Sequence, residues 1–150
     1  RQVRYIASLN ADTEAAAQPG IDAMTTQAHA VDDLTPMSDT PLTDLPFGVP
    51  APYWLDLREY HQVDVAATLD IPILVLQGGR DYQVTVADDL VHWQAGLAAR
   101  PRVTFQVYDA DDHLFLPGSG PSKPTDYETP QHVDPEVIND LTGWLTADRP

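Results

Sequence analysis

The sequence contains no cysteine. A disulfide framework, a thiolate zinc site and a cysteine nucleophile are therefore excluded. Basic residues are also scarce, with 8 Lys and Arg against 23 Asp and Glu, which gives a formal net charge of −15 at pH 7. A chain this acidic cannot neutralise a run of phosphates, so we expect neither nucleic acid nor a membrane surface as a partner.

Long apolar runs are missing as well, because no stretch approaches the roughly 18 residues that a membrane-spanning helix needs. The remaining composition, 43% hydrophobic and 21% charged, is that of a globular domain. The chain starts at Arg1, and no basic and then apolar signal segment follows. We therefore expect further residues of the gene product upstream of Arg1.

The first 62 residues combine helical patterns with a proline-rich connection. Apolar residues at helical spacing predict one helix near residues 3–9 and another over residues 21–31, separated by a break at Pro19-Gly20. Five prolines between residues 35 and 52 predict an irregular connection. A short helix is expected over residues 54–60, followed by a turn-like approach to Pro72.

The second part alternates strand and helix patterns. The continuous apolar run 71–77 predicts a strand buried within a parallel sheet, and residues 86–99 a helix. Residues 103–108 alternate apolar and polar side chains, which is typical of a strand nearer a sheet edge. The last helix is expected over residues 135–146, with Asp134 as its N-cap and a buried face formed by Val137, Ile138, Leu141, Trp144 and Leu145. The fold class is therefore α/β, with two adjacent parallel strands and flanking helices.

An acid and a histidine follow these two strands. Asp81 lies in the loop after the first strand and His113 in the loop after the second. Because the carboxyl ends of neighbouring parallel strands meet at one edge of a sheet, we expect these side chains to lie close together. A carboxylate that holds one imidazole nitrogen leaves the other nitrogen free as a base, which is two thirds of a nucleophile triad. The glycines before Asp81 are expected to allow a sharp backbone turn.

Plainer interpretations apply to several polar residues. Asp81 also suits a turn that follows a strand, and His113 a simple loop position. The acids Asp109, Asp111 and Asp112 match no calcium-loop spacing, so we interpret them as a solvated turn and predict no metal site. The other histidines lack paired ligand spacing and are expected at the surface: His29, His61, His92 and His132.

The residues around both loops resemble the C-terminal part of an α/β hydrolase, particularly bacterial esterase-like, dienelactone-hydrolase-like or serine-aminopeptidase-like members. The resemblance rests on segment 72–84 (PILVLQGGRDYQV), on segment 112–115 (DHLF) and on the closing helix that ends in Trp144-Leu145. It implies that Asp81 is the triad acid and His113 the triad base, in the chain order of that family. It further implies a helical cap over residues 1–62 and the last strands of the hydrolase core over residues 63–150.

The nucleophile of such a hydrolase is missing from the sequence. No G-x-S-x-G elbow is present, and its nearest imitation, Gly118 to Ser122, lies in a proline-rich loop without a preceding strand. We therefore expect the chain to be the C-terminal part of a serine hydrolase, inactive alone, whose small-molecule substrate is a carboxylic ester or an amide. No residue pattern requires a cofactor. Three aromatic residues are candidates to line the substrate pocket under the cap: Tyr53, Trp54 and Tyr82.

A second hypothesis belongs to another class of protein. A truncated, non-catalytic chain that keeps the cap and two strands would act as a binding or oligomerisation module. Its first strand would carry unpaired N–H and C=O groups, which a partner or a second copy of the chain would cover. This hypothesis predicts a homo-oligomer that forms through the sheet edge.

Overall fold

The computed structural model describes residues 1–147. The chain divides into two compact units, Arg1–Gln62 and a second unit that begins at Val63, and each is described here by itself. Among the helices of the described residues, none is long and apolar enough to cross a membrane.

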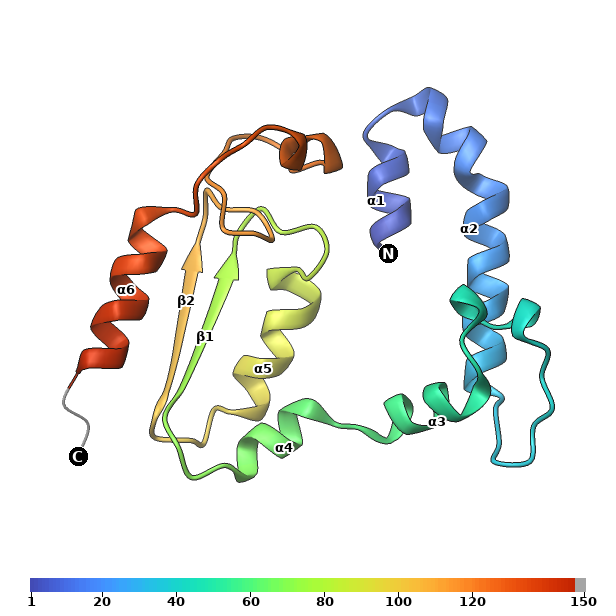
Figure 1. Ribbon diagram of the computed structural model, residues 1–150, viewed down its shortest axis with the longest axis horizontal. Helices are drawn as coiled ribbons and strands as arrows, with labels where there is room; N and C mark the ends of the chain where they lie inside the picture. Colours follow the sequence, from blue (N-terminus) through green and yellow to red (C-terminus); the bar gives the residue numbers. More distant parts are fainter. Residues whose placement is uncertain (148–150) are drawn as a thin grey trace. The chain divides into compact units, whose positions relative to one another are not determined.

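Two helices open the first unit, α1 (Gln2–Ser8) and α2 (Ala11–Asp32), and they run side by side (Figure 1). The predicted break at Pro19-Gly20 is wrong, because α2 continues through both residues. A proline inside a helix removes one backbone donor, and here Pro19 and Gly20 are exposed to solvent. The alanine-rich residues before Pro19 favour the helical state and support its continuation.

The proline-rich connection after α2 contains only two single turns of 3-10 helix, Leu42–Asp44 and Pro46–Gly48. It leads into α3 (Ala51–Glu59), which begins a turn earlier than expected. Leu34, Leu45 and Ala51 form a small buried core, against which four half-buried residues pack: Ala30, Val31, Trp54 and Leu55. The irregular segment is therefore fixed by apolar burial and not by regular hydrogen bonding.

The second unit is built on two parallel strands, β1 (Ile73–Gly78) and β2 (Val103–Tyr108). Ile73 pairs with Val103 and Gly78 with Tyr108, so both strands end at the same edge of the sheet (Figure 1). This arrangement confirms the predicted pair of adjacent parallel strands.

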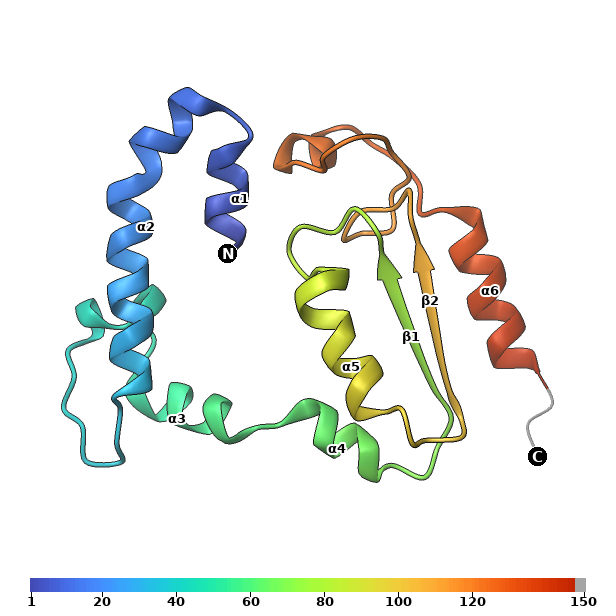
Figure 2. The same cartoon turned by 180° about the vertical axis from the view of Figure 1, so that it is seen from behind.

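Helices flank the sheet on both sides. In both views α5 (Val91–Gly96) lies on the side of β1 and α6 (Pro135–Thr146) on the side of β2 (Figures 1 and 2). The helix predicted over 86–99 starts as a π turn, Val86–Leu90, and its regular part ends at Gly96. A further helix, α4 (Gln62–Thr68), stands where only a turn was expected, and its Val63 methyl group occupies the space that a Cβ on Gly96 would need.

The ends of α6 agree with the sequence analysis, but its buried face does not. Asp134 caps the helix by accepting a hydrogen bond from the Glu136 N–H at 2.8 Å. Of the five side chains expected inside, Val137 is buried and Trp144 half-buried. The other three are exposed, because none of the described residues covers that side of the helix: Ile138 at 50%, Leu141 at 37% and Leu145 at 66%.

The strand predicted to be buried is only partly covered. Residues 73–76 of β1 are half-buried, and full burial begins at Gln77. Within the described chain, β1 pairs with β2 alone, so the other edge of each strand has no neighbouring strand to pair with. The expectation of a strand enclosed on both faces is therefore not met within residues 1–147.

Candidate active site

The loops that leave β1 and β2 bring Asp81 and His113 into direct contact. The imidazole Nδ1 of His113 lies 2.8 Å from Oδ2 of Asp81, although 32 positions separate the two residues. An ionised carboxylate only accepts hydrogen bonds, so the contact places the proton on Nδ1. The proximity expected from the parallel strand order is present.

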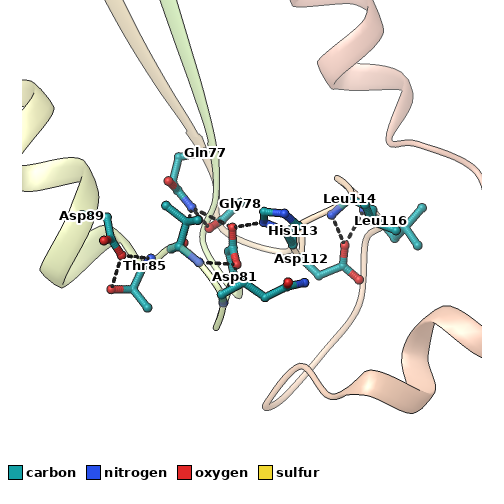
Figure 3. Close-up of polar contacts among 11 residues, drawn as sticks. Gln77, Gly78, Asp81, Thr85, Asp89, Asp112, His113, Leu114 and Leu116 are labelled. Atoms are coloured by element: carbon teal, nitrogen blue, oxygen red, sulfur yellow. Dashed lines mark hydrogen bonds and ion pairs between the residues drawn. The ribbon is translucent and has the colours of Figure 1, made fainter. Parts of the chain in front are cut away.

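The Asp81 carboxylate is surrounded by donors (Figure 3). Its Oδ1 accepts hydrogen bonds from the backbone N–H groups of Gln83 at 2.7 Å and Val84 at 3.0 Å. Its Oδ2 accepts from His113 and, at 3.4 Å, from the side-chain amide of Gln77. These four donors match the acceptor capacity of a carboxylate, and they fix the direction in which Asp81 faces His113.

Gln77 is the last polar residue before the loop and is buried. Besides Asp81, its amide nitrogen donates to the backbone carbonyls of Gly78 and Val84, each at 2.9 Å. Both carbonyls accept only, which fixes the orientation of the amide. Gln77 therefore ties the end of β1 to the far side of the loop that carries Asp81.

The imidazole of His113 is reachable from solvent, with 38% of its side chain exposed, whereas Asp81 exposes only 5% of its side chain. Among the described residues, none makes a hydrogen bond to Nε2 of His113. A neutral imidazole held in this way has a free basic nitrogen. Chemically, the pair can accept a proton at Nε2 while the carboxylate stabilises the resulting imidazolium.

The two glycines before Asp81 have a different role from the one expected. Neither has a positive φ, so neither is required for an unusual backbone turn. A Cβ on Gly78 would collide with the carbonyl of Asp112, and one on Gly79 would lie 2.7 Å from the Cα of Asp109. The glycines are needed because the loop that carries His113 lies directly against them.

The loop around His113 is held by the side chain before it. Oδ1 of Asp112 accepts hydrogen bonds from the N–H groups of Leu114 at 2.9 Å and Leu116 at 3.1 Å. Phe115 has a φ of 57°, a left-handed conformation that costs a non-glycine residue about 1 kcal/mol or more. Its N–H donates to the Asp112 carbonyl at 3.1 Å, and its ring packs edge-on against Tyr108, which together hold this conformation.

The expectation that the three acids form a solvated turn is wrong for two of them. Asp109 is exposed, but Asp111 and Asp112 are 0% and 1% exposed. Asp112 is buried because its carboxylate binds backbone N–H groups. Both carboxylate oxygens of Asp111 are without a hydrogen-bond partner among the described residues. Burial, followed by the nearby charges of Asp134, Asp112 and Glu136, raises the pKa of Asp111 to about 6.

The three candidate pocket residues lie in different surroundings. In the first unit, Tyr53 is 53% exposed. Its neighbour Trp54 is half-buried, donates its indole N–H to the Val49 carbonyl at 3.0 Å and meets Tyr53 edge-on at 5.3 Å. In the second unit, Tyr82 directly follows Asp81 but is only 7% exposed. Trp54 and Tyr82 thus contribute to packing where they lie.

The remaining histidines, His29, His61, His92 and His132, are exposed, as the sequence predicts. Within residues 1–147, no group of three or more His, Asp or Glu side chains is arranged to hold a metal ion.

The sequence analysis missed Gln77, Arg80 and Asp112, which all hold the two loops in place. Gln77 could have been noticed as a polar residue that ends an apolar strand, because a buried amide must find partners. Asp112 could have been noticed as an acid two residues before a backbone N–H that it can bind. Arg80 gives no local signal, since its partners lie 30 to 40 residues further along the chain.

Comparison with curated proteins relates the chain to an esterase. Over 107 residues, or 71% of this chain, it is 39% identical to a protein named Esterase EstD from Thermotoga maritima. The match covers 26% of that relative, so the chain spans about a quarter of its length. No family model matches the chain, and no solved structure matches it.

Proposed function

We propose that this chain is the C-terminal part of a serine hydrolase of the α/β-hydrolase fold, and that it supplies the acid and the base of the catalytic triad. The observation that carries the proposal is the 2.8 Å contact between buried Asp81 and accessible His113 at the carboxyl edge of two parallel strands. The relative's name supports a carboxylic ester as the substrate, with an amide as the alternative.

In this mechanism each residue of the pair has one role. Nε2 of His113 removes the proton from a serine hydroxyl as the serine attacks the ester carbonyl, and later returns a proton to the leaving group. Asp81 holds Nδ1 protonated and stabilises the imidazolium that forms between these steps. The nucleophile and the donors that stabilise the oxyanion belong to a part of the protein outside this chain.

The role of the first unit follows from the same proposal. Residues 1–62 form a helical cap and residues 63–150 the last part of the hydrolase core, and Tyr53, the exposed one of the three aromatic candidates, contributes aromatic surface to the substrate pocket. The half-buried residues of β1 and the exposed apolar residues of α6 support the assignment of the second unit to a larger core, since further layers of a larger sheet would cover them.

The same exposed surfaces favour a second candidate function. A non-catalytic chain that used β1 and the apolar side of α6 to bind a partner or a second copy would also bury them. The two candidates differ in whether a reactive serine accompanies the pair.

Labelling with a fluorophosphonate tests the first proposal. The full-length gene product, this 150-residue chain alone, and full-length Asp81→Asn and His113→Ala variants are compared by intact mass. Asp70→Asn and His92→Ala serve as controls, because both side chains are exposed. We expect one labelled serine in the full-length protein and in both controls, and none in the other samples. A folded full-length protein that remains unlabelled would exclude the triad and favour the binding module.

A further inference from the structure

The side chain of Arg80 is mostly buried, with 13% exposed, and it binds residues far along the chain. Its Nε donates to the Gly120 carbonyl at 2.8 Å, and its Nη1 to the Ala110 carbonyl at 3.1 Å. Its Nη2 donates to the Ser119 carbonyl at 3.5 Å and lies 3.6 Å from Oδ2 of Asp126. The planar guanidinium thus presents three separate nitrogens in a fixed fork to these acceptors, a geometry that the compact ammonium of a lysine does not reproduce.

The acceptors of Arg80 stand at the two ends of one loop. Ala110 precedes His113, and Ser119 and Gly120 follow it. The ends are also joined by the backbone, because the Gly118 N–H donates to the Ala110 carbonyl at 2.8 Å. A Cβ on Gly118 would collide with the Arg80 guanidinium, so the loop is shaped around this side chain.

Arg80 and Asp81 are consecutive, and both hold the same loop. The backbone N–H of Arg80 donates to the Asp111 carbonyl at 2.8 Å, which joins the two loops beside His113. The Arg80 side chain closes the loop at its ends, whereas the Asp81 carboxylate binds His113 near its middle. Residues 109–123 contain no helix or strand, so their shape depends on such contacts.

We propose that Arg80 is a positioning residue for the acid–base pair: by closing the loop from Ala110 to Gly120, its guanidinium holds His113 in the tautomer and orientation that Asp81 requires. The inference rests on the proposed function, because it assigns Arg80 to the same site. Arg80 makes no hydrogen bond or ion pair with His113, so we assign its effect on the reaction to the loop.

The test uses the full-length gene product with Arg80→Lys and Arg80→Ala variants. Arg102→Lys is the matched control, because Arg102 is also ion-paired to an aspartate, at 2.7 Å, but is 41% exposed. Selective ¹⁵N labelling of histidine, with His113 assigned from a His113→Asn variant, reports which ring nitrogen carries the proton. Circular dichroism verifies that each variant is folded.

We expect His113 to carry its proton on Nδ1 in the unmodified protein and in Arg102→Lys. In Arg80→Lys we expect the mixture of tautomers of an unrestrained histidine, and a kcat for a p-nitrophenyl ester that falls about 100-fold with KM changed less than about twofold. Methylguanidinium should restore part of the activity of Arg80→Ala by occupying the vacated space.

Unchanged histidine signals in folded Arg80→Lys would overturn the inference, whatever the activity. If Arg80→Ala does not fold, the histidine ¹⁵N signals of two other variants still test the role of Arg80: Arg80→Lys, and Gly118→Ala, in which the new Cβ crowds the guanidinium. Absence of ester hydrolysis in the unmodified protein would instead contradict the proposed function, and the tautomer measurement would remain decisive for Arg80.

Discussion

The Asp81 side chain is 5% exposed, and the His113 side chain that it binds is 38% exposed. The acid is therefore shielded from water, while the base can reach a second molecule. The other donors hold the Asp81 carboxylate in one orientation, with Oδ2 on the imidazole, where its charge stabilises the imidazolium.

Replacing this carboxylate should abolish most of the activity of the full-length protein. In Asp81→Asn the amide nitrogen faces the imidazole and favours the wrong tautomer, so we expect kcat for an ester to fall about 10⁴-fold. Steady-state kinetics measure the effect. Asp70→Asn, whose side chain is fully exposed, should retain activity within about twofold. A loss of less than tenfold in Asp81→Asn would contradict a triad role for this residue.

Asp111 should make stability fall as the pH rises. Its pKa increases from 3.8 in the unfolded chain to about 6 in the folded state, so between these values the folded state binds the proton more tightly. Ionisation of the carboxyl group then opposes folding, by up to about 3 kcal/mol once the pH exceeds 6.

An Asp111→Asn variant should lose this dependence. We expect denaturant unfolding of the full-length protein to show the variant more stable than the unmodified protein at pH 8, with the difference shrinking toward pH 4. The exposed neighbour offers a matched control, since Asp109→Asn should leave the pH profile unchanged. Equal profiles for Asp111→Asn and the unmodified protein would show that Asp111 ionises without cost.

Two glycine-to-alanine substitutions should have opposite effects. Gly78→Ala forces the new Cβ against the Asp112 carbonyl, so the loop that carries His113 must move, and we expect both stability and activity to fall. Gly143→Ala meets no atom within 4 Å in α6, so the greater helix propensity of alanine should stabilise the protein by up to about 1 kcal/mol. Thermal unfolding and ester hydrolysis measure both, and an active, equally stable Gly78→Ala would refute the close approach of the loop.

The 150-residue chain alone should self-associate. Ile138, Leu141 and Leu145 form an exposed apolar stripe on α6, and β1 pairs along one edge only within the described residues. We expect light scattering to show a mass that rises with concentration. A monomer over a wide concentration range would contradict this prediction.

Charged substitutions show which surface causes the self-association. Ile138→Lys with Leu145→Lys should reduce the association if the stripe contributes to it. Met37→Lys is the control, because Met37 is 91% exposed but belongs to the other unit.

Elements with a strong local pattern could be predicted from the sequence. The residues of β2 and α6 were placed correctly because alternation and a capping aspartate mark their boundaries locally. The continuation of α2 through Pro19 and the presence of α4 could not be predicted in the same way, because each depends on exposure or packing that single-sequence patterns do not contain.

The candidate site was predictable only in its outline. Asp81 and His113 follow parallel strands, so topology alone brings them together. The burial of Asp111 and the contacts of Arg80 depend on how a loop without regular structure folds back, which no periodicity encodes. The sequence predicts that the apolar side of α6 is core, but this side is exposed, because amphipathicity indicates which face is apolar and not whether a covering layer is present.

The hydrogen bonds that orient Asp81 and His113 come from a short stretch of the chain, between Gln77 and Gly120. The crossover from β1 to β2 and the loop that follows β2 therefore carry these bonds together, and none of the described side chains of the first unit takes part in them. If the protein is divided just before β1, the piece that begins at β1 should accordingly keep the Asp81–His113 contact. Adding a separately expressed piece that carries the serine should then restore activity.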